Sequence, residues 1–151
     1  NWPGTAAESQ KRQAALGPRD MTIDLGDGVT LKLVHLPAGE FVMGDADGQP
    51  DEWPLTRVVI RKPFWMGACE VSNEQYRRFD ASHDCRYYGK RHAEADDQGF
   101  PLNAAKQPVV RVSWDEATAF CHWLSQRTGK KFGVFLVAGK FDGDIHIHKN
   151  G

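Results

Sequence analysis

Residues 108–124 read PVVRVSWDEATAFCHWL, and this stretch contains the clearest start of a helix in the chain. Ser113 and Glu116 have the spacing of a capping box, in which each side chain binds the main-chain N–H of the other residue. Apolar residues follow at helical spacing, namely Trp114, Ala117, Phe120, Cys121 and Leu124. Gly129 is placed to end the helix. We therefore expect a helix between Ser113 and Gly129 whose aromatic side chains pack in the core, and a short strand before it at Val109–Val112.

A second, shorter helix is expected upstream. Ser72 stands where a helix N-cap belongs, and Gln75 follows three residues later. Tyr76 and Phe79 then fall on one helical face. These features predict a helix over residues 73–80.

The part of the chain before these helices has the pattern of β-strands. Met21–Leu25 and Val29–Leu36 alternate in polarity and are separated by Gly26-Asp27-Gly28, a strong signal for a hairpin. Val29, Leu31 and Leu33 share one face of the second strand. Further strands are expected in three ranges, Glu40–Met43, Thr56–Arg61 and Phe64–Glu70.

Two loops and an N-terminal segment complete the pattern. Residues 45–54 are acidic but lack the full oxygen-ligand order of an EF-hand, so we interpret them as a solvated loop. Residues 81–107 form a long irregular stretch with several histidines and aspartates, which we read as solvated because they lack ligand spacing. Residues 1–20 are expected to be a linker or arm, with a short helix over Ala6–Leu16 as the alternative.

Composition bounds the function. The chain has 151 residues, 40% hydrophobic and 26% charged, with a formal net charge of −1, which is typical of one soluble globular domain. Nothing here favours nucleic acid or a membrane as a partner. No signal peptide is visible, and the compartment is left open. The three cysteines, Cys69, Cys85 and Cys121, have no metal-ligand spacing; buried thiols are the favoured interpretation, and one disulfide with one free thiol is the alternative.

Four short signatures occur in order along residues 33–132: LPAGEFVMG at 36–44, EVSNEQY at 70–76, PVVRVSWDEA at 108–117 and FCHWL at 120–124. Together they resemble the front half of a formylglycine-generating enzyme (sulfatase-modifying factor) domain. The resemblance implies an α+β fold, an irregular mixed domain similar to C-type lectins. Its motif residues are expected to be structural, with no catalytic residue among them: Glu70, Asn73, Ser113, Trp114 and Cys121. Glu70 and Asn73 are expected to bind free N–H groups where the first helix begins.

The same resemblance implies a chemistry that this chain does not complete. Family enzymes use oxygen and copper(I) to oxidise a cysteine of a sulfatase to Cα-formylglycine, and they depend on two cysteines late in the domain, where calcium sites also lie. After Phe132 the sequence departs from the family, and neither late cysteine has a counterpart here. In some family members the cysteine that matches Cys121 forms a disulfide with a later cysteine, and that partner has no counterpart here either. We therefore expect a truncated domain, inactive as it stands and without a cofactor of its own, whose partner by resemblance is a sulfatase polypeptide.

The tail at 133–151 is foreign to this pattern. Phe132–Ala138 and Ile145–His148 have the character of strands, with a turn at Asp142-Gly143 that would make a hairpin. Asp144, His146 and His148 would then share one strand face, where they are candidate ligands for a divalent metal. A plain polar strand face is the favoured interpretation, because no fourth ligand is implied.

A second function is therefore weighed beside the enzyme family. A lectin-like scaffold can serve as a non-catalytic binding module, with the 81–107 loop as its contact surface. The candidate contact residues are Tyr87, Tyr88, His92 and Phe100, since aromatic residues are favoured at interfaces. A metal enzyme built on His146 and His148 is the third hypothesis.

Overall fold

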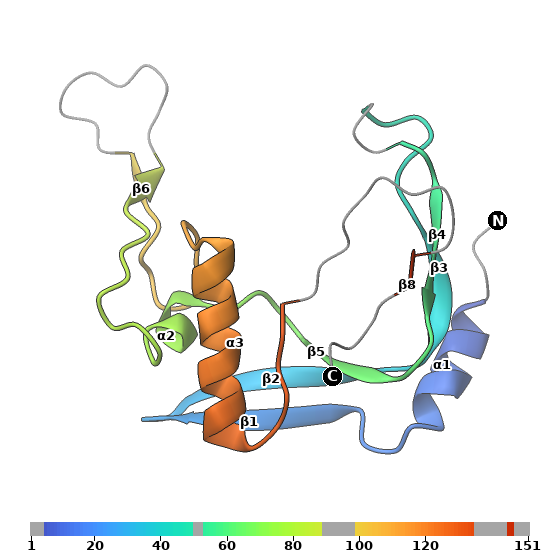
Figure 1. Cartoon of the computed structure of the whole chain (residues 1–151), viewed down its shortest axis with the longest axis horizontal. Helices are drawn as coiled ribbons and strands as arrows, with labels where there is room; N and C mark the ends of the chain where they lie inside the picture. The colour runs from blue at the N-terminus through green and yellow to red at the C-terminus, as the bar shows by residue number, and fades with distance from the viewer. Residues whose placement is uncertain (1–4, 50–52, 89–98, 135–144, 147–151) are drawn as a thin grey trace. The chain divides into compact units, whose positions relative to one another are not determined.

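The computed structural model describes residues 5–49, 53–88, 99–134 and 145–146 (Figure 1). In chain order the elements are α1 (Ala6–Ala14), β1 (Asp20–Gly26), β2 (Val29–Leu36), β3 (Gly39–Met43), β4 (Thr56–Ile60), β5 (Phe64–Gly67), α2 (Asn73–Tyr76), β6 (Tyr87–Tyr88), β7 (Phe100–Pro101), α3 (Trp114–Thr128) and β8 (Ile145–His146). The described residues form three small sheets, with strand orders β1-β2-β5, β3-β4-β8 and β6-β7. Within the described residues, no helix has the length and apolar character needed to cross a membrane.

The chain divides into two compact units, which we describe separately. The first contains residues 1–21, 34–66 and 136–151, and the second contains residues 22–33 and 67–135. The β1–β2 hairpin contributes residues to both. The candidate site described below lies wholly in the second unit.

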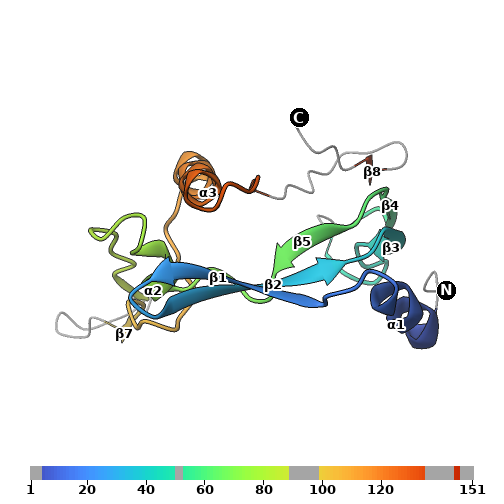
Figure 2. The same ribbon diagram turned by 90° about the horizontal axis from the view of Figure 1, so that it is seen from below.

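The predicted β1–β2 hairpin is confirmed (Figure 2). Asp27 and Gly28 have φ of 51° and 76°, so both central residues of the two-residue turn are left-handed, as a type I′ turn requires. The buried side chains recur at every second residue of each strand: Ile23, Leu25, Leu31 and Leu33. One face of the hairpin therefore supplies the core of the second unit.

In the first unit, β3 and β4 pair antiparallel with Phe41 opposite Val58, and Val58 is fully buried. Residues Ile145–His146 pair with β4 in parallel. The predicted tail hairpin would have paired this strand with residues 132–138. Residues 132–134 form no strand, and residues 135–144 lie outside the described part of the chain.

Residues 6–14 form the helix that was the alternative to a linker. Thr5 caps it, because its hydroxyl accepts the Glu8 N–H while the Glu8 carboxylate accepts the Thr5 N–H. Gln13 then donates its side-chain amide to the carbonyl of His35 at 3.2 Å. The segment is thus tied to strand β2 by a side chain from its last turn.

In the second unit, α2 and α3 share an aromatic cluster. Tyr76 stacks on Phe120 with ring centroids 5.5 Å apart, and Phe79 lies 6.0 Å from both Phe120 and Trp123. The Ser113 capping box is confirmed, and Gly129 ends α3 at φ 67°. Helix α2 is shorter than the predicted 73–80, because Arg78 and Phe79 donate to carbonyls three residues back and tighten the chain into turns.

Of two further predicted strands, one is shorter than expected and the other is not formed. Strand β5 ends at Gly67 rather than Glu70, since the chain bends there so sharply that a Cβ at Gly67 would lie 3.0 Å from the Cys69 carbonyl oxygen. Val109–Val112 is not a strand, because Arg111 adopts φ 59° and interrupts the extended backbone. The only pairing that the described residues form there is an isolated bridge between Ser72 and Pro108.

Candidate functional site

Asn73 is the centre of a hydrogen-bonded cluster that fixes the long loop. The residue is 1% exposed, and its side-chain amide donates to the carbonyls of Leu102 at 2.7 Å and Ala104 at 2.9 Å. Its side-chain oxygen accepts the thiol of Cys85 at 3.0 Å. One buried amide thus joins the start of α2 to both sides of the loop, and every polar atom of that side chain is bonded.

Cys85 extends this cluster toward α3. Its side chain is fully buried, and besides Asn73 its sulfur contacts both the carbonyl and the N–H of Val110 at 3.3 Å. Its main-chain N–H donates to the Asn103 side chain at 2.9 Å. The interpretation of this cysteine as a buried thiol is therefore confirmed.

Asn103 links the cluster to charged residues. Its side-chain amide donates to the Asp84 carboxylate, and its main-chain carbonyl oxygen accepts from Arg77 at 3.1 Å. The Asn103 bond, followed by the Arg86 N–H, lowers the pKa of Asp84 below its ordinary value. Both sides of the loop are therefore held by side-chain bonds where regular strands are short.

Strands β6 and β7 form a two-stranded ribbon next to this cluster, and its aromatic side chains face solvent. Tyr87 is opposite Pro101 and Tyr88 is opposite Phe100. Tyr87, Tyr88 and Phe100 are 44%, 67% and 68% exposed. The structure thus brings together three of the four predicted contact residues, while His92 lies outside the described residues.

Arg111 fastens the ribbon to the start of α3. Its guanidinium donates to the carbonyls of Cys85 at 3.1 Å and Tyr87 at 3.5 Å. The backbone at Arg111 is left-handed, and so is that of Arg86 at φ 58°. Sequence reasoning passed over Arg111, although a non-glycine residue held at positive φ is a useful signal of function once a structure is known.

The expected structural motif residues take different positions. Glu70 is exposed, and Asn73 binds the loop, so neither caps α2 as expected. The N–H groups at that helix start are satisfied by Ser72 and by the carbonyls of Ala105 and Gln107.

Trp114 was expected in the core and is instead 53% exposed. On a helix of 3.6 residues per turn it points about 100° away from the direction shared by Phe120 and Leu124, the two buried residues of α3. Ser113 caps the helix as predicted, and Cys121 is half-buried.

Titratable groups gather where α2 and α3 meet. Burial raises the pKa of Tyr76, and the nearby carboxylates of Glu116 and Asp80 raise it further. The Ser113 N–H and hydroxyl lower the pKa of Glu116. His83 packs edge-to-face on Tyr76 with ring centroids 4.9 Å apart, and its Nε2 lies 2.9 Å from the Val110 carbonyl oxygen. The arrangement serves packing and capping, since each carboxylate is engaged by main-chain N–H groups.

The three thiols differ in exposure and in their hydrogen bonds, which bears on the copper(I) chemistry of the enzymes that the sequence resembles. A copper(I) centre needs soft thiolate ligands. All three cysteines are free: Cys85 is fully buried with its sulfur engaged in hydrogen bonds, and burial raises the pKa of Cys121. Cys69 is exposed. Within the described ranges, no three His, Cys, Asp or Glu side chains gather in a way that suits a metal ion.

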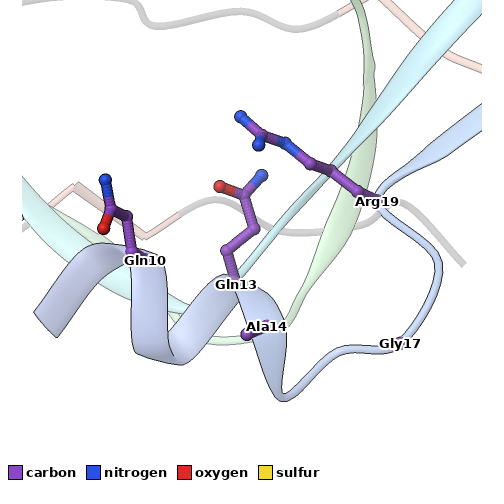
Figure 3. Close-up of a pocket in the computed structure, with 5 residues that line it drawn as sticks. All are labelled: Gln10, Gln13, Ala14, Gly17 and Arg19. Carbon is purple, nitrogen blue, oxygen red and sulfur yellow. The ribbon is translucent and has the colours of Figure 1, made fainter. Parts of the chain in front are cut away.

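The proposed tail ligands are not brought together by the described residues. Asp144 and His148 lie outside them, and His146 is described only by its backbone pairing with Val59. In the first unit, a shallow hollow of about 180 Å³ lies between α1 and the turn before β1 (Figure 3). Figure 3 shows the side chains of Gln10, Gln13 and Arg19 around it, and we assign it no role because its charged residue is exposed.

Comparison with known proteins places this architecture in a family. The family described as "Sulfatase-modifying factor enzyme 1-like domain" matches residues 28–136, well over half of the chain. The "Inactive C-alpha-formylglycine-generating enzyme 2" of Bos taurus is 26% identical, with 82% of this chain and 54% of that protein covered. The "Formylglycine-generating enzyme" of Mus musculus is 27% identical, with 81% and 43% covered. The "Serine/threonine-protein kinase pkn1" of Chlamydia pneumoniae is 29% identical, with 66% and 18% covered.

A solved structure agrees. PvdO from Pseudomonas aeruginosa has a TM-score of 0.53 and 28% identity, with 74% of this chain and 45% of that chain covered. The chain thus spans about half the length, or less, of these relatives. The family and the α+β fold expected from the four signatures are confirmed. This chain belongs to the sulfatase-modifying factor enzyme 1-like family.

Proposed function

We propose that the chain binds a segment of another polypeptide on the β6–β7 ribbon, and that these 151 residues do not themselves oxidise a cysteine. The observation that carries the proposal is the contrast within the loop. Tyr88 and Phe100 are each about two-thirds exposed, yet the residues beneath them are fixed by the buried cluster around Asn73. Aromatic side chains held on a rigid base bind a partner with little loss of conformational entropy.

The partner in this proposal is a sulfatase polypeptide. The family to which the chain belongs is described by its action on sulfatases, and its relatives include both a formylglycine-generating enzyme and an inactive one. Binding without oxidation matches the inactive relative. Because the chain spans only part of these proteins, the identity of the partner as a sulfatase belongs to the proposal.

The non-oxidising part of the proposal is supported by the state of the cysteines. A reactive thiolate needs a lowered pKa and access to its substrate. Cys85 lacks access, and burial shifts the pKa of Cys121 in the opposite direction. Neither is suited to exchange electrons with a substrate cysteine. The third thiol, Cys69, is exposed but single, whereas the chemistry of the resembled enzymes depends on a pair of cysteines.

The test is a titration of the purified chain with a fluorescent sulfatase peptide that contains the target cysteine, followed by the mass of the peptide after incubation with copper and oxygen. We expect saturable binding that the paired substitution Tyr88→Ser and Phe100→Ser weakens at least about tenfold. The matched control is Trp114→Ser, another exposed aromatic residue, which lies on α3 rather than on the ribbon. Unchanged affinity in the ribbon variant, or conversion of the cysteine to an aldehyde, would overturn the proposal.

A further inference from the structure

The described residues of the ribbon and its flanks carry a net positive charge, to which the family comparison assigns no role. The described residues on its two sides, 84–88 and 99–112, contain three cations (Arg86, Lys106 and Arg111) and one carboxylate (Asp84). Lys106 is paired with Glu74, and Asp84 is influenced by the charge of Arg86. Arg111 differs from Lys106 because, among the described residues, its hydrogen bonds go to main-chain carbonyls and not to a carboxylate.

The position of Arg111 suits it to meet a ligand on the ribbon. Its hydrogen bonds go to two carbonyl oxygens, which accept N–H groups but carry no formal charge. A guanidinium has five N–H donors in a planar fork, so donors remain for a carboxylate. The residue is exposed, and its Nη2 lies 3.5 Å from the carbonyl oxygen of Tyr87 in strand β6.

The backbone holds this guanidinium in place. The neighbouring Val110 is bonded through its N–H and its carbonyl to Cys85, and the same carbonyl lies 2.9 Å from His83 Nε2. Arg111 itself is left-handed at φ 59°, a conformation that persists only where surrounding contacts determine it. The charge is therefore presented beside the ribbon by a fixed segment.

The aromatic residues define the other half of the surface. Tyr88 and Phe100 are opposite each other in the antiparallel pair, so their side chains leave the same face of the ribbon, while Tyr87 and Pro101 leave the other face. An exposed aromatic pair with a fixed guanidinium nearby suits a ligand that has both an apolar side chain and a carboxylate.

We propose that the ribbon selects an acidic segment of its polypeptide partner, with Arg111 recognising a carboxylate and Tyr88 and Phe100 contacting an apolar side chain beside it. This inference rests on the proposed function, because it takes the ribbon to be the binding surface. It adds the chemical class of the ligand and a residue that determines specificity.

The experiment compares two peptides of equal length and apolar content, one with aspartates beside an aromatic residue and one with asparagines at those positions. We expect the acidic peptide to bind the intact chain about fivefold more tightly at low salt, the upper end of what an exposed ion pair contributes. Raising the ionic strength removes this difference, because exposed charges are screened. Arg111→Gln also removes it without weakening the asparagine peptide, whereas Lys130→Gln, a change of an exposed cation on the turn after α3, leaves it intact.

The outcomes separate the two proposals. Equal binding of both peptides, lost in the Tyr88→Ser and Phe100→Ser variant, overturns the acidic preference and leaves ribbon binding standing. Binding of neither peptide overturns both. If Arg111→Gln unfolds the chain, the affinities of the unmodified protein for the two peptides, measured at low and high salt, still decide whether the inference holds. A preference for the acidic peptide that survives high salt counts against the inference.

Discussion

Replacing Asn73 by alanine tests whether the buried cluster holds the loop. The substitution removes two N–H···O bonds, at 2.7 Å and 2.9 Å, and the oxygen that accepts the Cys85 thiol. Each normal bond contributes about 1 kcal/mol, and a buried carbonyl left without a donor costs about 1–3 kcal/mol. Allowing for partial relaxation of the loop, we expect a loss of about 3–4 kcal/mol in the free energy of unfolding, a large share of the total stability of a small domain.

Equilibrium unfolding in urea, followed by tryptophan fluorescence, measures this loss. Gln126→Ala, an exposed change on α3, is the control and is expected to stay within about 0.5 kcal/mol of the unmodified chain. The cluster also predicts coupling, so that Asn73→Ala and Cys85→Ala together cost less than the sum of the two alone. A loss below about 1 kcal/mol for Asn73→Ala would refute the reasoning, because it would mean that the loop is held by other contacts.

Three further predictions follow from exposure and charge. With a thiol reagent under native conditions, we expect exposed Cys69 to be modified first, half-buried Cys121 slowly because burial raises its pKa, and Cys85 only after unfolding. Mass spectrometry of the labelled peptides gives the order of modification, and early labelling of Cys85 would contradict this expectation. Because the pKa of Glu116 is lowered in the folded chain, its carboxylate stabilises the fold at pH values above its ordinary pKa of 4.5, and this contribution is lost as the pH falls through the lower folded pKa. Glu116→Gln keeps a capping side chain, so it should flatten the pH dependence of helix unfolding measured by circular dichroism. An unchanged pH dependence would exclude the carboxylate as its source. Asp27→Ala should destabilise the chain by about 1 kcal/mol or more, because it removes the ion pair with Arg78 and places alanine at a left-handed φ that it tolerates poorly. Asp27→Gly should recover part of that loss, as measured by thermal unfolding. Equal losses in the two variants would argue against a role of the backbone conformation.

Local patterns in the sequence predicted the elements that depend on near neighbours. The β1–β2 hairpin followed from Asp27-Gly28, and α3 followed from Ser113, Glu116 and the spacing of its apolar residues. These features act over a few residues, so that sequence spacing alone describes them. The family, too, was predictable from four ordered signatures.

The errors have a common physical origin in long-range contacts. Val109–Val112 has strand propensity, but its main chain binds Val71 and Cys85, far away in the sequence, and Arg111 turns left-handed. Asn73 was expected to cap α2, yet its amide binds carbonyls 29 and 31 residues later. The exposed aromatic pair was predicted as a contact surface, whereas the guanidinium beside it depends on a backbone conformation that sequence does not reveal.

The most direct test of the central claim is one titration, of a sulfatase peptide onto the intact chain and onto its Tyr88→Ser and Phe100→Ser variant, with the peptide mass recorded at the end. The account predicts saturable binding by the intact chain, at least about tenfold weaker binding by a variant that unfolds at the same urea concentration, and a peptide of unchanged mass. Equal affinity of the two proteins would contradict the ribbon as the binding surface. A peptide whose cysteine has become an aldehyde would contradict the claim that these residues bind without oxidising.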